Sequence, residues 1–345
     1  MMQLEAVKLL DEEPLCNTQI TLHDFIRIGS ESYDAVIMNA FKNKMRKFKT
    51  KISFSMNFDP VAVIEVPNVF ETRISHACNC IVALNVTEFI CFDLNSHRKV
   101  HSFPAAFAFY FDIEENYDGK GSDALIYGGD RGVFKYDLNK IMNGEDLNNI
   151  WNQPEIHSMG MVCSPHNDVL SKNVLYVCSY DTCISALKSL TGEVLYRIQH
   201  FENTTGYYFE HTPVCFSDID VNDTDTELFV SATKSKRIYN FHRIAHNNHQ
   251  DDWQLIREFG GEYLTHPDGM VFDSVSRHVL VCEQQQQAKG CILVVFTEKG
   301  EFVKRVDVKG KDVKRHASPT GLCLDERTGL LYVVDCANFL IQIFK

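Results

Sequence analysis

The stretch that decides the fold is HASPTGLCLDERTGLLYVVDCANFLIQIFK, residues 316–345. It contains an apolar strand entered through Pro-x-Gly, a polar turn, a second apolar strand that ends at an Asp, and a third strand. The same pattern recurs upstream over residues 266–296. The Pro, Gly and Asp positions of the two copies are Pro319, Gly321 and Asp325, and Pro267, Gly269 and Asp273. Self-similarity at a fixed period indicates a repeat architecture.

The middle of the second strand in each copy provides a ruler along the chain. Neighbouring ruler positions are 44 to 53 residues apart, so six units fit between residues 60 and 345. The ruler residues are Val82, Ile126, Val177, Val230, Val281 and Val333. One small antiparallel sheet cannot bury both of its faces, whereas sheets stacked around an axis bury each face on a neighbour. The strands are apolar on both faces, and we therefore predict an all-β fold, a six-bladed β-propeller with a short N-terminal helical leader.

At these residues the chain resembles a known family. Pro319-Thr-Gly321-Leu-Cys-Leu-Asp325, Leu331-Tyr-Val-Val-Asp335 and Asn338-Phe-Leu-Ile-Gln-Ile-Phe344 look like an NHL repeat, a module that builds six-bladed propellers. The copy at 266–296 is similar. Earlier copies depart from the pattern: Pro213-Val-Cys215 lacks the glycine and Ser158-Met-Gly160 lacks the proline. The resemblance implies the propeller fold but no particular activity, because one fold supports many functions.

The last unit supplies only three strands before residue 345, so its outer edge needs a partner. Propellers generally avoid such an edge by taking the missing strand from the other end of the chain. We predict residues 61–66, VAVIEV, as this closing strand, with the alternating segment 52–58 as a rival or a companion. The predicted domains are a helical leader over 1–58 and an NHL-type propeller over 59–345.

The leader contains an amphipathic pattern that begins at Tyr33 and ends in a basic run from Lys42 to Lys51 without any acid. Its apolar positions recur at helical spacing, which predicts a helix. We expect this helix to pack on the acidic propeller. A basic amphipathic helix also suits a membrane surface, a nucleic acid or a partner protein, and these alternatives stay open. The residues do not establish a role in recruiting a ubiquitin ligase.

Charge and cysteine content narrow the class of partner and the compartment. The net charge is −12, and residues 59–345 carry 26 Lys or Arg against 39 Asp or Glu, which makes nucleic acid an unlikely ligand. Most of the 12 cysteines lie in apolar strand runs and none forms a CxxC pair, so we expect neither a zinc clip nor a disulfide framework. With no signal peptide and no transmembrane segment in the pattern, we expect a cytoplasmic or nuclear protein.

Two sets of residues could bring chemistry to the central channel. Four histidines precede the inner strands of successive units: His157, His211, His266 and His316. The peptidylglycine amidating lyases, which this repeat type resembles, hold zinc with channel histidines, but the four histidines here differ in register and we expect loop positions. The second set ends the second strands, at Asp335, Glu283, Ser231, Ser179 and Gly128. These residues could bind Ca²⁺ as in propeller lactonases, yet Asx side chains more often shape turns.

Aromatic and histidine side chains gather in the two longest irregular insertions, 202–212 and 245–253. Loops on a rigid scaffold commonly carry recognition residues. The predicted partner-binding residues are Tyr207, Tyr208, Phe209, His249 and Trp253. No catalytic motif appears, so we expect no enzyme and no cofactor, and we predict a protein–protein interaction scaffold or adaptor. The alternatives are a metal-dependent lyase or hydrolase with Zn²⁺ or Ca²⁺ in the channel, and an RNA-binding propeller.

Overall fold

The computed structural model describes ten stretches of the chain. They are residues 51–105, 108–129, 131–145, 148–164, 173–179, 182–199, 214–244, 252–283, 291–308 and 318–345. Contacts group Lys47–Lys345 into one compact unit. The predicted leader helix lies outside the described residues.

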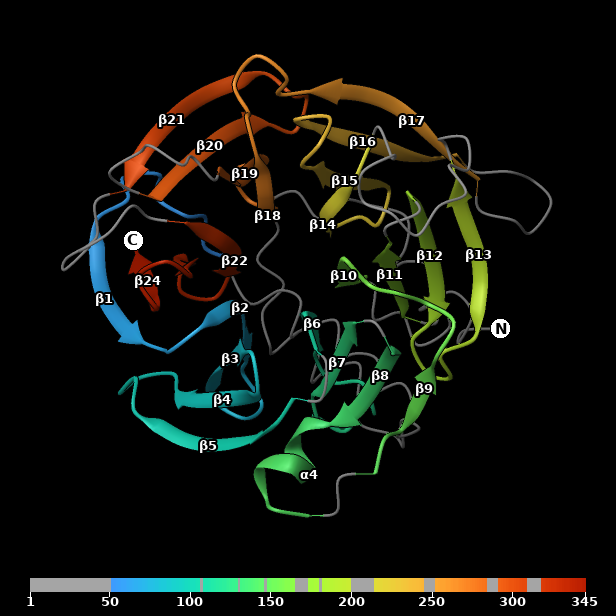
Figure 1. Cartoon of the computed structure of the whole chain (residues 1–345), viewed down its shortest axis with the longest axis vertical. Coiled ribbons are helices and arrows are strands. Elements are labelled where there is room, and N and C mark those ends of the chain that lie inside the picture. Colours follow the sequence, from blue (N-terminus) through green and yellow to red (C-terminus); the bar gives the residue numbers. More distant parts are fainter. Residues whose placement is uncertain are drawn as a thin grey trace, which may run out of the picture. The chain divides into compact units, whose positions relative to one another are not determined.

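The unit consists of six four-stranded antiparallel sheets arranged around an axis (Figure 1). Blade 1 consists of β2(Val69–Ser75), β3(Cys80–Asn85), β4(Glu88–Asp93) and β5(Lys99–Pro104). Blade 2 consists of β6(Tyr110–Glu114), β7(Ala124–Gly129), β8(Gly132–Asp137) and β9(Trp151–Gln153). Blade 3 consists of β10(Gly160–Cys163), β11(Val174–Cys178), β12(Cys183–Lys188) and β13(Val194–Gln199). Blade 4 consists of β14(Phe216–Val221), β15(Glu227–Ala232), β16(Arg237–Ile244) and β17(Asp252–Phe259). Blade 5 consists of β18(Pro267–Asp273), β19(His278–Glu283), β20(Cys291–Thr297) and β21(Phe302–Val308). Blade 6 consists of β22(Pro319–Asp325), β23(Leu330–Asp335), β24(Leu340–Phe344) and, from the other end of the sequence, β1(Pro60–Glu65). The predicted six-bladed propeller is confirmed.

Each ruler residue lies in the second strand of its blade, as the spacing predicts. The first strand of each blade contacts the first strands of both neighbouring blades, which closes the ring around the axis. The buried apolar side chains form six clusters, and each cluster fills the seam between two adjacent blades. Repetition therefore replaces a single core with six equivalent seams.

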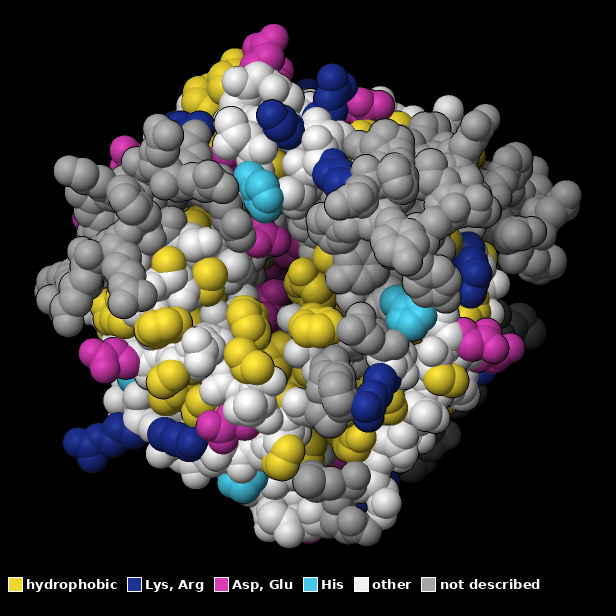
Figure 2. Space-filling view, viewed as in Figure 1, with side chains coloured by type: hydrophobic (Ala, Val, Ile, Leu, Met, Phe, Trp, Pro, Cys, Tyr) yellow, Lys and Arg dark blue, Asp and Glu magenta, His cyan; other side chains and the backbone are white. Residues whose placement is uncertain are grey.

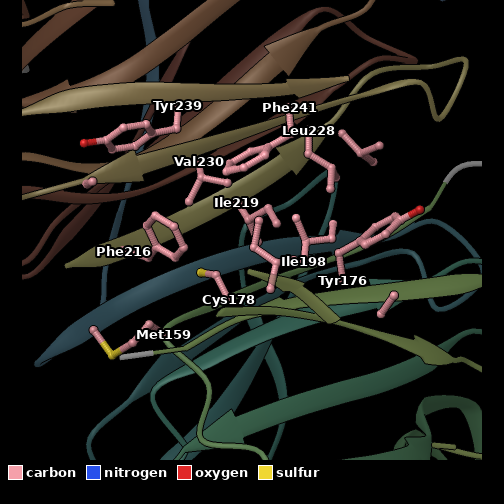
Figure 3. Close-up of a cluster of buried hydrophobic side chains, with 14 of the residues drawn as sticks. Met159, Tyr176, Cys178, Ile198, Phe216, Ile219, Leu228, Val230, Tyr239 and Phe241 are labelled. Atoms are coloured by element: carbon pink, nitrogen blue, oxygen red, sulfur yellow. The ribbon is translucent and has the colours of Figure 1, made fainter. Parts of the chain in front are cut away.

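The seam between blades 3 and 4 shows how one strand serves two seams (Figure 3). Leu228 and Val230 of β15 pack toward blade 3, where they join Tyr176 and Ile198. Phe229, between them, points the other way into the seam with blade 5. Because successive side chains of a strand alternate between its faces, burial on both faces requires the continuous apolar runs seen in the sequence.

The ring is closed by β1, which pairs antiparallel with β24 and completes blade 6. The pairing joins Ala62 to Ile343 and Ile64 to Ile341 in register. The Val66 amide donates to the Phe339 carbonyl at 2.8 Å and extends this contact by one residue. β1 thus covers the apolar edge of β24, which would otherwise be exposed.

Residues 51–58 form no strand, although their alternating pattern suggested one. Met56 and Phe58 adopt positive φ angles of 62° and 59°, which a strand cannot contain. Phe54 and Phe58 nevertheless pack edge-to-face at 4.8 Å and are buried in the seam between blades 5 and 6. This segment, placed in the leader by the sequence pattern, contributes two aromatic side chains to the propeller.

A single short helix, α4(Leu138–Met142), occurs among the described residues, where it connects β8 to β9. The side chain of Asp137 caps it by accepting from the Lys140 amide at 3.0 Å. The described part of the chain contains no helix with the length and apolarity that crossing a bilayer requires.

Candidate functional site

The inner strands line a central channel, and one position on them decides how closely neighbouring blades approach. The ruler residues of blades 3 to 6 pair with Met161, Ile219, Met270 and Leu322. The residues that precede these four are Gly160, Asp218, Gly269 and Gly321. A Cβ on Gly269 would lie 2.2 Å from the backbone oxygen of Thr320, and one on Gly321 would lie 2.6 Å from Oε1 of Glu71. The glycine of the repeat therefore permits close contact between neighbouring inner strands.

This register corrects the alignment of blade 4. The segment Pro213-Val-Cys215 was aligned with the Pro-x-Gly motif, but Phe216-Ser217-Asp218 occupies that place in the sheet. An alignment anchored on Pro213 is therefore shifted by three residues relative to the register of the sheet. Blade 4 thus carries an aspartate where blades 3, 5 and 6 carry glycine.

Charged side chains gather around Arg73 inside the channel. Its Nη1 donates to Oε1 of Glu71 at 2.5 Å and to the backbone oxygen of Leu322 at 3.2 Å, so it links blades 1 and 6. Its Nε lies 3.4 Å from Oδ1 of Asp112 in blade 2. Figure 2 shows acidic side chains deep in the central opening, with apolar side chains around it. A largely buried arginine of this kind requires carboxylates beside it.

Three aspartates share one hydrogen-bonding pattern. Asp112, Asp218 and Asp220 each accept from the next amide of their own strand and from an amide on the inner strand of the following blade. The distances to the following blade are 2.7 Å to Cys163 N, 2.9 Å to Met270 N and 2.7 Å to Phe272 N, in that order. Inner strands have one edge without a sheet partner, and these carboxylates satisfy its amide groups.

Burial changes the protonation of these acids. Desolvation raises the pKa of Glu71 to about 8, with repulsion from Asp218 adding to the effect and the charge of Arg73 opposing it. Desolvation likewise raises the pKa of Asp220 to about 7 and that of Asp218 to about 6. The channel therefore keeps protons at a pH where ordinary carboxyl groups have lost them.

An open hollow of about 200 Å³ lies at the mouth of the channel where the inner strands end. Its lining comes from the ends of four inner strands and from the turns that follow them. The apolar lining residues are Val162, Val221, Val271, Phe272 and Leu324, and the polar and charged ones are Lys51, Cys163, Asp220, Asp223, Ser274 and Glu326. This volume lies below the range of about 300–1,000 Å³ that is typical of pockets for whole small molecules.

The predicted channel histidines are only partly covered by the structure. His157 and His266 lie in the connections before β10 and β18, partly and largely exposed respectively. His211 and His316 lie outside the described residues. Across the described stretches, no three His, Cys, Asp or Glu side chains come close enough together to hold a metal ion. The zinc hypothesis that used all four histidines stays a prediction.

The acids that end the second strands accept hydrogen bonds from nearby backbone amides. Asp335 accepts from the amides of Ser318 and Asn338 at 3.1 and 3.3 Å, and Glu283 accepts from the Thr265 amide at 2.7 Å. These contacts match the turn-shaping role that we expected for Asp335.

Of the predicted partner-binding residues, the structure describes Trp253 alone; Tyr207, Tyr208, Phe209 and His249 lie outside it. Trp253 is the second residue of β17 and packs edge-to-face on Tyr176 at 5.6 Å, and its indole N–H donates to the Tyr196 hydroxyl at 3.2 Å. The guanidinium of Arg243 lies 5.3 Å from its ring centre. Trp253 therefore fills the outer part of the seam between blades 3 and 4.

Sequence reasoning missed the channel residues Glu71, Arg73, Asp112, Asp218 and Asp220. Their signal was present as charged residues at alternate positions within short apolar strands, as in FETRI over 70–74 and SDIDV over 217–221. Alternate residues of a strand share a face, so a face with such charges had to meet other charges or solvent. The ten cysteines whose side chains the structure describes form no disulfide bond.

Comparison with known proteins supports the fold. The NHL repeat model matches residues 317–344. No curated protein matches the sequence. Among solved structures, the β-propeller domain of Cps50 (Swd1) from Myceliophteria thermophila is similar, with a TM-score of 0.55, 10% sequence identity, and coverage of 83% of this chain and 99% of that one. At this identity the likeness concerns the fold alone. The chain is a six-bladed β-propeller, and its last blade matches the NHL repeat.

Proposed function

We propose that this propeller is a non-catalytic protein-binding module, a scaffold or adaptor, which recognises a peptide segment of its partner at the hollow. The observation that carries the proposal is the hollow itself, about 200 Å³ in volume and lined by both apolar and charged side chains. Recognition sites typically combine an apolar wall with a few placed polar groups. The free thiols support a reducing compartment, the cytoplasm or the nucleus.

The charged groups around the hollow are engaged in contacts that hold its lining in place. Glu326 is paired with Lys51 at 2.6 Å, and Asp223 is paired with Arg277 at 2.6 Å. The aspartate at the end of the channel, Asp220, holds two backbone amides. These groups, together with the Ser274 hydroxyl, which donates to Glu326 and accepts from Lys51, fix the shape of the hollow.

The proposal can be tested by selecting displayed peptides on the full-length protein and measuring their affinity for three variants. Val271→Phe fills the hollow from its wall, and Ser274→Trp fills it from its rim. Val303→Phe is the matched control, because Val303 lies on outer strand β21 with 42% of its surface exposed. We expect both hollow variants to weaken binding at least tenfold and the control to leave it unchanged.

Thermal melting of each variant identifies a loss of fold. If Val271→Phe melts early, the rim variant Ser274→Trp decides the outcome. Selected peptides that bind both hollow variants as tightly as the wild type, or a failure to select any peptide, would contradict the proposal.

A further inference from the structure

We propose that the hollow binds the guanidinium group of an arginine side chain in the partner peptide, with the Asp220 carboxylate as its acceptor. This inference rests on the proposed function and specifies the chemistry of the partner. It follows from the charges that line the hollow, from the geometry of Asp220 and from the apolar wall beside it.

The charges of the hollow leave one carboxyl group without a cation. Lys51 is paired with Glu326, and Arg277 with Asp223. Among the described residues, no Lys, Arg or His side chain forms an ion pair with Asp220. Arg73, the cation of the channel, forms its ion pairs with Glu71 and Asp112, and its charge acts on Asp220 only from a distance. The hollow therefore offers a site for one positive charge.

Asp220 is held in a fixed orientation that suits a planar, two-pronged donor. Oδ1 accepts from the Val221 amide at 2.7 Å and Oδ2 from the Phe272 amide at 2.7 Å. Each carboxylate oxygen has a second lone pair, so both oxygens can accept one further hydrogen bond. The guanidinium fork of arginine matches a carboxylate through two parallel N–H bonds, which the single ammonium of lysine cannot reproduce.

The wall of the hollow fits the remainder of an arginine side chain. Val162, Val221 and Leu324 line it together with Val271, and none of the four carries a polar side-chain atom. The methylene stem of arginine buries readily along an apolar surface of this kind while its head group reaches a polar partner. An ordinary metal ion fits less well, because no cluster of three metal-ligating side chains occurs in the described stretches.

Asp112 provides a matched control for Asp220. It forms the same pair of hydrogen bonds, to its own strand and to the following blade, at 2.8 and 2.7 Å. It does not line the hollow, and its neighbouring cation is Arg73. Replacing either aspartate by asparagine keeps an acceptor oxygen and removes the charge. A difference in ligand affinity between the two variants therefore reflects contact with the ligand and not the loss of a hydrogen bond between blades.

The experiment measures binding of N-acetyl-arginine methylamide to the full-length protein by ligand-observed NMR titration. N-acetyl-citrulline methylamide is the neutral isostere, and N-acetyl-lysine methylamide tests the fork geometry. We expect the arginine probe to bind the wild type and Asp112→Asn alike and to bind Asp220→Asn at least tenfold more weakly. The citrulline probe should not bind, and the lysine probe should bind more weakly than the arginine probe.

Equal binding of the citrulline and arginine probes, or equal affinity of the arginine probe for wild type and Asp220→Asn, would overturn the inference. If Asp220→Asn does not fold, Val271→Phe replaces it, and undiminished arginine binding by that variant is the contrary result. Should the arginine probe fail while selected peptides still lose affinity on Val271→Phe, the arginine assignment fails and the proposed function stands. If the selected peptides bind Val271→Phe as tightly as the wild type, both the arginine assignment and the proposed function are overturned.

Discussion

The seam between blades 5 and 6 and the seam between blades 4 and 5 join inner strands in different ways. At the first, Gly269 lets β18 approach the backbone of β22 so closely that a Cβ would lie 2.2 Å from a carbonyl oxygen. At the second, Asp218 and Asp220 reach from β14 to the amides of β18. The comparison teaches that glycine and aspartate are alternative ways to join neighbouring blades at the channel.

The largest effect is expected from removing the segment that closes the ring. Deleting residues 1–66 removes β1 from β24 and takes Phe54 and Phe58 out of the seam between blades 5 and 6. Loss of one buried Phe typically costs about 3–5 kcal/mol, and a domain is stable by only about 5–15 kcal/mol. We expect no soluble folded monomer, as measured by size-exclusion chromatography and circular dichroism.

Deleting residues 1–50 is the matched control, because it leaves every contact described for residues 51–345 in place. A folded monomer from the longer deletion, with the melting temperature of the shorter one, would show that β1 does not seal the ring.

The next effect tests the glycine seam directly. Gly269→Ala places a methyl group against backbone atoms of β22, which cannot rotate away, so strain or separation of the two strands must follow. Overpacking of this kind costs about 1–3 kcal/mol. Gly261→Ala is the control, since its nearest atom, on the Arg237 side chain, lies at 3.4 Å. Urea denaturation should give a clear loss of unfolding free energy for the first variant and little change for the second.

A smaller loss is expected at the aspartate seam. Asp218→Ala leaves the amides of Met270 and Ile219 without their acceptor, and an unsatisfied buried group costs about 1–3 kcal/mol. Asp218→Asn retains an acceptor oxygen and should lose less. The same urea experiment ranks the two variants. If alanine and asparagine are equally tolerated, the carboxylate does not hold the seam together.

The sequence predicted the ring far better than the site, and the reason differs between the two seams. Pro267, Gly269 and Asp273 repeat the pattern of the last blade, so the fold could be recognised from periodicity alone. Asp218 and Asp220 break the pattern, and their meaning depends on strands about fifty residues away that the chain brings beside them. Side chains that act across a seam leave no periodic signal. The hollow likewise arises where four strand ends meet and belongs to no single repeat.

The smallest and most distributed effect is a dependence of stability on pH, which the buried acids of the channel should produce, two of them at the aspartate seam and none at the glycine seam. Glu71, Asp220 and Asp218 have pKa values raised to about 8, 7 and 6 in the folded protein, chiefly by desolvation. Between the ordinary carboxyl pKa and these values, the folded protein holds protons that the unfolded chain has released. The unfolding free energy therefore falls as the pH rises through this range.

We expect the melting temperature to fall by roughly 5 °C between pH 6 and pH 8.5, measured by differential scanning calorimetry. Glu71→Gln removes the group with the highest of these pKa values and should flatten the upper part of the curve. Burial raises the pKa of Asp325, but hydrogen bonds from His76, Thr328 and the Arg327 amide outweigh burial and lower this pKa below its ordinary value. Asp325 therefore titrates below this pH window and does not mask the effect. A melting temperature that is constant or rises over this range would mean that the channel carboxyl groups are already ionised at pH 6. In that case Glu71, Asp218 and Asp220 would be held by charge pairing with Arg73 and by solvent, and the aspartate seam would differ from the glycine seam in geometry alone.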